Sequence, residues 1–155
     1  MASSVERVRE ALTQVGLVPR IVELSQSTRT ASEAAAAIGT SVPRIVKSLV
    51  FLADGEPIVV LASGANRVDT TRLAGELEKQ VERADAERVR SATGFSIGGV
   101  APLGYPSPLD VVLDRDLLQY DEVWAAAGTP NAVFPIQPSE LVRVTGARVL
   151  DIKES

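Results

Sequence analysis

The chain contains neither cysteine nor histidine in its 155 residues. Without cysteine it has no disulfides, no thiolate metal ligands and no cysteine nucleophile. Without histidine a Ser-His-Asp triad is excluded, and scattered carboxylates alone make a poor zinc site. These absences leave few ways to do chemistry, and we expect neither a metal nor a cofactor.

Aromatic residues and long apolar runs are also scarce. Aromatic residues make up 4% of the chain, which argues against a stacking platform for single-stranded nucleic acid. The formal net charge of −4 argues against broad binding to a nucleic-acid backbone but allows a small basic patch on one or two phosphates. No stretch approaches the roughly 18–20 apolar residues of a membrane span. We expect one domain over residues 1–155, cytoplasmic, with no membrane partner.

Helical and extended patterns alternate along the chain without a regular βαβ period. Apolar spacing and capping residues predict helices over 4–15, 34–38, 70–77, 86–92 and 138–145. Apolar, β-branched runs predict strands over 20–24, 47–53, 57–62, 111–113, 123–127, 133–134 and 148–152. Strands 47–53 and 57–62 form a hairpin through a short turn. The expected fold is therefore mixed α/β (α+β-like), with a central, largely antiparallel sheet flanked by helices.

Lys47 is conspicuous because residues 44–52 are the most apolar and β-branched run of the sequence. Burying an ammonium group costs several kcal/mol unless it is paired or its pKa falls. Lys47 is therefore either an outward-facing strand residue, with its head in water, or a functional residue. Its position in the sequence leaves both interpretations open.

Two segments rich in glycine and proline are candidates for ligand contacts. Residues 94–108 form a long loop, and long ordered loops in compact domains are often functional. The pair Gly98 and Gly99 allows the backbone to approach a ligand closely, and its N–H groups suit a phosphate or an oxyanion. The second segment, residues 128–131, follows a predicted strand and is equally an ordinary turn.

Four segments, in the same order, resemble the YbaK/ProX family, the free-standing relatives of the editing insertion domain of bacterial prolyl-tRNA synthetase. The similarity runs from residue 26 to residue 151. It is most specific where Ile-Val-Lys-Ser-Leu-Val-Phe and Gly-Phe-Ser-Ile-Gly-Gly-Val-Ala-Pro occur at this separation. The matching segments are residues 44–55, 63–69, 93–102 and 121–146.

The resemblance implies a mixed α/β editing domain and a trans-editing hydrolase that deacylates mischarged aminoacyl-tRNA. It implies that Lys47 is the main functional side chain and that Gly128 lines the same pocket. The residues that it places at the aminoacyl ester form one loop: Gly98, Gly99, Val100, Ala101 and Pro102. Ser48 and Thr129 are secondary candidates for substrate binding. Some family members carry asparagine at the position of Ser48 and several carry histidine at that of Thr129, so amino-acid preference stays open.

An aminoacyl ester is already activated, so positioning and charge stabilisation can supply much of the acceleration without a protein nucleophile. We expect Lys47 to anchor the terminal-adenosine phosphate or the polar head of the substrate. Backbone groups of the loop would hold the carbonyl while water attacks, with the adenosine 2′-OH as a candidate assistant. Four arginines are candidates for phosphate contacts: Arg29, Arg44, Arg67 and Arg72.

Two alternatives stay open. The first is a non-catalytic module that binds a nucleotide, an aminoacyl adenylate or a tRNA acceptor end, which the absence of histidine favours. The second is a domain that docks on an aminoacyl-tRNA synthetase. Loss of ester from mischarged tRNA separates the enzyme from both.

Overall fold

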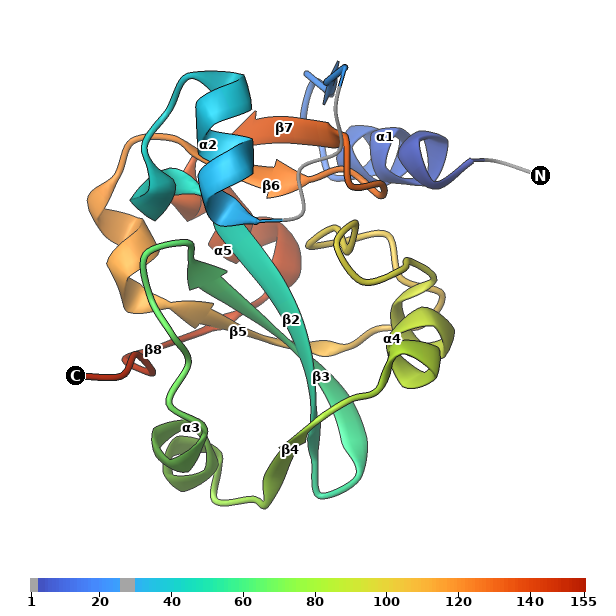
Figure 1. The fold of residues 1–155 in the computed structure, drawn as a ribbon. Coiled ribbons are helices and arrows are strands. Elements are labelled where there is room, and N and C mark those ends of the chain that lie inside the picture. The colour runs from blue at the N-terminus through green and yellow to red at the C-terminus, as the bar shows by residue number, and fades with distance from the viewer. Residues whose placement is uncertain (1–2, 26–29) are drawn as a thin grey trace.

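Two β-sheets organise the fold, which a computed structural model describes over residues 3–25 and 30–155 (Figure 1). The helices are α1 (Ser4–Gln14), α2 (Ala31–Ile38), α3 (Thr70–Leu77), α4 (Ala86–Thr93) and α5 (Pro138–Thr145). The strands are β1 (Val22–Glu23), β2 (Val46–Ala53), β3 (Glu56–Ser63), β4 (Val81–Arg83), β5 (Asp110–Asp114), β6 (Val123–Ala126), β7 (Ala132–Ile136) and β8 (Arg148–Leu150). Short 3-10 helices cover Val42–Arg44 and Arg115–Gln119.

The larger sheet has five strands in the order β4-β2-β3-β5-β8. The predicted hairpin is confirmed, since β2 and β3 pair antiparallel and place Lys47 opposite Ala62. Strand β5 pairs parallel with both β3 and β8. The connection from β3 to β5 passes through α3, β4 and α4, and such a long crossover is what a parallel pair requires. The mixed α/β fold is confirmed, with a sheet that is mixed rather than purely antiparallel.

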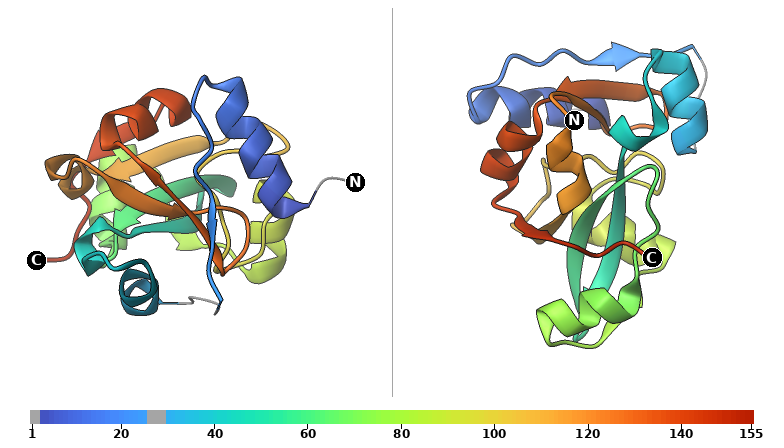
Figure 2. Two further views of the ribbon diagram at one scale, coloured as in Figure 1. Left: turned by 90° about the horizontal axis from the view of Figure 1, so that it is seen from above. Right: turned by 90° about the vertical axis from the view of Figure 1, so that its left-hand side faces the viewer.

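The smaller sheet consists of β1, β7 and β6, all paired antiparallel. A parallel bridge between Ile45 and Trp124 joins the smaller sheet to the residue that precedes β2. Figure 1 and the right-hand view of Figure 2 show this sheet lying across one end of the long β2–β3 hairpin, with α3 beside the other end. The candidate functional site lies near this junction.

Helix ends follow the capping residues of the sequence. The side chains of Thr30, Asp69 and Asp85 accept hydrogen bonds from the first turns of α2, α3 and α4. Glycines in the left-handed conformation end three helices: Gly39, Gly94 and Gly146. Helix α2 begins at Ala31, three residues earlier than predicted, because Thr30 is its N-cap. In the described part of the chain, none of the helices is long and apolar enough to span a bilayer.

Strand β2 buries a different hydrophobic cluster on each face. Val46 and Val50 belong to the main core, which extends to Phe95 and Phe134. Phe51 and its neighbours on the other face pack in a second cluster with Leu73 of α3 and Ile152. Because successive strand residues point to opposite faces, Ser48 lies on the main-core face and Lys47 on the other.

Candidate functional site

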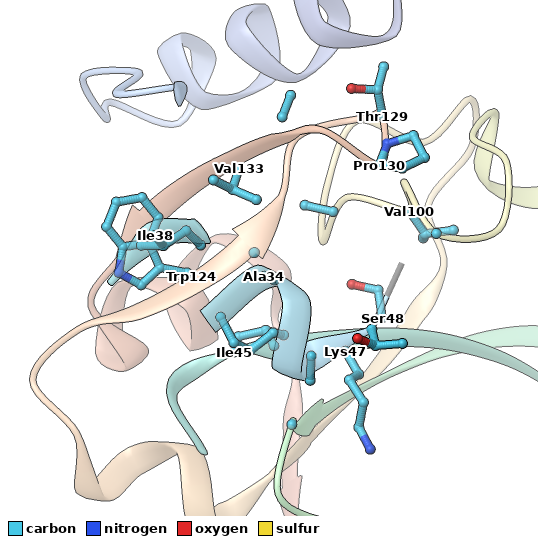
Figure 3. A pocket seen from close by; sticks show the side chains of 18 of the residues that line it. Ala34, Ile38, Ile45, Lys47, Ser48, Val100, Trp124, Thr129, Pro130 and Val133 are labelled. Atoms are coloured by element: carbon cyan, nitrogen blue, oxygen red, sulfur yellow. The ribbon is translucent and has the colours of Figure 1, made fainter. Parts of the chain in front are cut away.

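A cavity of about 510 Å³ lies where the two sheets meet (Figure 3). Its walls are α2, the start of β2, the loop before Val100, and strands β6 and β7 with the turn between them. This volume is in the range of ligand pockets, roughly 300–1,000 Å³. The predicted site residues that line it are Lys47, Ser48, Gly98, Val100 and Thr129.

The other predicted site residues support the walls instead of lining the cavity. A Cβ at Gly128 would lie 2.7 Å from the carbonyl oxygen of Ser4, so this glycine lets the turn pack on α1. Ala101 is fully buried in the main core, and its carbonyl accepts a hydrogen bond of 2.7 Å from the hydroxyl of Tyr105. Pro102 is likewise buried. Gly128 therefore fixes the turn on α1, and Ala101 and Pro102 fix the loop in the core.

Gly99 sets the distance between the loop and the β6–β7 turn. A Cβ at this position would lie 2.8 Å from Cα of Thr129 and 3.0 Å from the carbonyl oxygen of Gly128. Such separations are too short for any side chain, so only glycine permits this approach. Two segments that the sequence identified separately, residues 94–108 and 128–131, are therefore in direct backbone contact.

Lys47 lines the cavity with its stem while its head turns away. Its ammonium group donates a hydrogen bond to the backbone carbonyl of Asn66, and Figure 3 shows the side chain running away from Thr129 and Val100. Burial lowers the pKa of Lys47, the negative charge of Asp114 partly opposes this, and Arg67 and Arg83 lower it slightly further. The lysine is thus half-buried and braced at the cavity edge.

A network of carboxylates holds the partner of Lys47. The side-chain amide of Asn66 donates to Asp114 at 2.8 Å and to Asp116 at 2.9 Å. Asp114 is 1% exposed and also accepts from the backbone N–H of Ser63 at 3.0 Å. Hydrogen bonds from Lys153 and Asn66 lower the pKa of Asp116. Sequence reasoning missed this network; its one signal was Asn66, inside the segment 63–69 that carries the family resemblance.

Ser48 points into the cavity, on the side from which the Lys47 side chain turns away. Figure 3 shows its side chain on the side of Val100. Its hydroxyl oxygen is buried and has no hydrogen-bond partner within residues 3–25 and 30–155. A buried hydroxyl without a partner is rare in folded proteins, so Ser48 is suited to bind a polar group of a ligand.

The arginines proposed for phosphate contacts are not gathered at one place. Arg44 pairs with Asp121 at 3.0 Å and Arg72 with Asp151 at 3.1 Å. Arg67 is exposed and close enough to influence Lys47. Arg29 lies outside the described residues. Across the described ranges, no group of three or more potential metal ligands comes together.

Residues 25–144 match the model of the aminoacyl-tRNA editing domain. The chain belongs to this family. It is 30% identical over 147 residues to the uncharacterised protein YwhH of Bacillus subtilis strain 168, covering 94% of each chain. It is 34% identical over 91 residues to the proline--tRNA ligase of Streptococcus suis strain 05ZYH33, a match that spans 56% of this chain and 14% of the ligase.

The editing domain also has solved structural relatives. One, described as a candidate trans-editing enzyme for prolyl-tRNA synthetase, superposes with a TM-score of 0.94 at 47% identity, over 100% of this chain and 99% of that one. The predicted resemblance to prolyl-tRNA editing domains is thereby confirmed. Membership of the family supports an editing role for the protein.

Proposed function

We propose that the protein is a deacylase that hydrolyses the ester of a mischarged aminoacyl-tRNA. The observation that carries this proposal is the cavity that joins Lys47 and Ser48 of β2 to Gly98, Val100 and Thr129. It is large enough for an aminoacyl ester, and it is built by a member of the editing-domain family. A chain of net charge −4 can serve this role because only the acceptor end of the tRNA enters the site.

The glycine loop, residues 98–102, supplies the donors for the ester carbonyl. Gly98 and Val100 line the cavity, and within the described residues neither backbone N–H has an acceptor, whereas that of Gly99 donates to Ser96 at 3.0 Å. Backbone N–H groups fixed in this way stabilise the negative charge that develops on a carbonyl oxygen under attack. The packing of Gly99 on the β6–β7 turn keeps the N–H groups of Gly98 and Val100 in position before the substrate binds.

Lys47 serves as an anchor for the substrate and not as a base. An ammonium group has three donors, and the contact with Asn66 uses one of them. Asp114 favours the charged form of the lysine, against the effect of burial. The remaining donors are available for the phosphate of the terminal adenosine.

The reaction needs no nucleophile from the protein. Water adds to the ester carbonyl, the bond between that carbon and the ribose oxygen breaks, and a proton passes to the ribose oxygen. The products are the free amino acid and a tRNA with its terminal hydroxyl restored. We infer that the adenosine 2′-OH assists the water, in keeping with a site without histidine.

A panel of mischarged tRNAs tests the proposal, with tRNA for proline first because of the synthetase relatives. We expect ester loss above the spontaneous rate and a decrease on the order of 100-fold in Lys47→Ala. Lys79→Ala, at an exposed lysine, is the matched control and retains activity. Full activity in a folded Lys47→Ala protein contradicts the role of Lys47. Saturable binding without ester loss identifies a binding module, and synthetase binding that survives Lys47→Ala identifies a docking domain.

A further inference from the structure

The cavity is polar at one end and aliphatic at the other. Ser48, Gly98 and Thr129 lie at the polar end, beside the loop and the turn. The opposite end is walled by Ala34 and Ile38 of α2 and by Trp124 and Val133 of the small sheet. Figure 3 shows Ile38, Trp124 and Val133 grouped together, apart from Ser48, Val100 and Pro130. A ligand that fills this space therefore has a polar head and an aliphatic tail.

The unpartnered hydroxyl of Ser48 can fix the orientation of an aminoacyl ester in this space. Its oxygen is buried without a partner among the described residues and suits the α-ammonium group of the substrate. The ester carbonyl takes the N–H groups at Gly98 and Val100. The side chain of the amino acid is the remaining substituent, and the end of the cavity left for it is walled by Ala34, Ile38, Trp124 and Val133.

We propose that the aliphatic end is a subsite for an amino-acid side chain larger than a methyl group, with Ala34 limiting its depth. This inference rests on the proposed deacylase function and names its substrate class. A methyl group leaves most of the space between α2 and the small sheet unfilled, and an unfilled apolar space forfeits dispersion contacts. A branched aliphatic side chain such as that of valine or leucine makes those contacts with Ile38 and Trp124.

Ala34 and Ala36 provide a matched pair of variants on one helix. Ala34 is 6% exposed and lines the cavity, whereas Ala36 is exposed and does not. Ala34→Leu fills the aliphatic end, and Ala36→Leu adds the same atoms outside the cavity. Both changes suit a helix, because leucine has a helix propensity close to that of alanine.

The experiment uses one tRNA acylated chemically with alanine, valine or leucine and measures kcat/KM for ester loss. The wild type is expected to favour the valine or leucine ester over alanine by about tenfold or more. Ala34→Leu is expected to remove that preference by lowering kcat/KM for the valine and leucine esters more than for the alanine ester, and Ala36→Leu is expected to keep it. The wild-type ranking tests the inference even if Ala34→Leu does not fold.

Two results overturn the inference alone. The first is a wild type that hydrolyses the alanine ester as fast as the leucine ester. The second is an equal loss for every ester in a folded Ala34→Leu protein, which would place the terminal adenosine, common to all substrates, at the aliphatic end. A wild type that hydrolyses none of the esters overturns the proposed function as well, so the two failures are distinguishable.

Discussion

The ammonium group of Lys47 donates a hydrogen bond to the backbone carbonyl of Asn66, on the face of β2 opposite to Ser48. Asn66 is itself fixed by the buried carboxylate of Asp114 and by Asp116. The position of the lysine therefore depends on a chain of polar contacts that begins in the interior of the larger sheet. Asn66 is a positioning residue for the proposed anchor.

Asn66→Ala tests this dependence. The change removes two hydrogen bonds to carboxylates and leaves part of Asp114 unsatisfied, so we expect the free energy of unfolding to fall by about 1–3 kcal/mol. Deacylation by the folded protein should also fall, because the backbone carbonyl that accepts from Lys47 is no longer held in place by the Asn66 side chain. Urea unfolding and kcat/KM measure the two effects. Gln80→Ala, at an exposed amide, is the control; equal behaviour of the two variants would show that Asn66 positions nothing.

The lowered pKa of Lys47 predicts a dependence of stability on pH. Burial lowers this pKa below 10.5, so between the lowered value and 10.5 the unfolded chain binds more protons at this residue than the folded protein. The contribution of Lys47 to the free energy of unfolding therefore rises with pH across that window. In Lys47→Met this rise is absent. Urea unfolding at several alkaline pH values measures it, and a difference between wild type and variant that does not change with pH contradicts the assignment.

Local signals predicted most of the fold. Capping residues gave helix ends such as Asp69 and Gly146, and apolar runs gave the β2–β3 hairpin. Strand β4 was missed because its three residues, Val81–Arg83, include a single apolar side chain. Its extended form comes from pairing with the end of β2, a contact that no local pattern encodes.

The candidate site was predicted in composition more than in geometry. The resemblance identified Lys47, Ser48 and the glycine loop, and these lie at one cavity. It also implied that Gly128 lines the pocket, whereas the structure packs this glycine on Ser4 of α1. Alternation along β2 implies that Lys47 and Ser48 diverge. Which face carries the cavity depends on how the small sheet packs, and this is not visible in the sequence.

Gly99→Ala is expected to destabilise the protein and to impair the site together. The added methyl group would meet the backbone of Thr129 at 2.8 Å, so the loop must move away from the turn. We expect a loss of about 1–3 kcal/mol in the free energy of unfolding and a decrease in deacylation. Gly75→Ala in α3 is the control, because nothing lies within 4 Å of its Cβ. That change should stabilise the helix by up to about 1 kcal/mol; a similar gain from Gly99→Ala would show that the loop and the turn are not in contact.

Tyr105→Phe tests whether the glycine loop is braced from its far side. The hydroxyl of Tyr105 donates to the carbonyl of Ala101 at 2.7 Å, and burial raises the pKa of Tyr105, which keeps the hydroxyl a donor. Removing it leaves a buried carbonyl without this donor, so stability should fall by about 0.5–1.5 kcal/mol. Deacylation by the folded protein should also fall, because the loop that positions the N–H groups of Gly98 and Val100 is less firmly held.

Tyr120→Phe is the matched control for this prediction. It removes the same hydroxyl but keeps the ring beneath Arg44, whose guanidinium carbon lies 5.1 Å from the ring centre. Its stability should therefore change by less than about 0.5 kcal/mol. Thermal unfolding and kcat/KM on the same mischarged tRNA compare the two variants. If Tyr105→Phe lost stability but kept full activity, the hydrogen bond to Ala101 would support the core and not the proposed oxyanion donors.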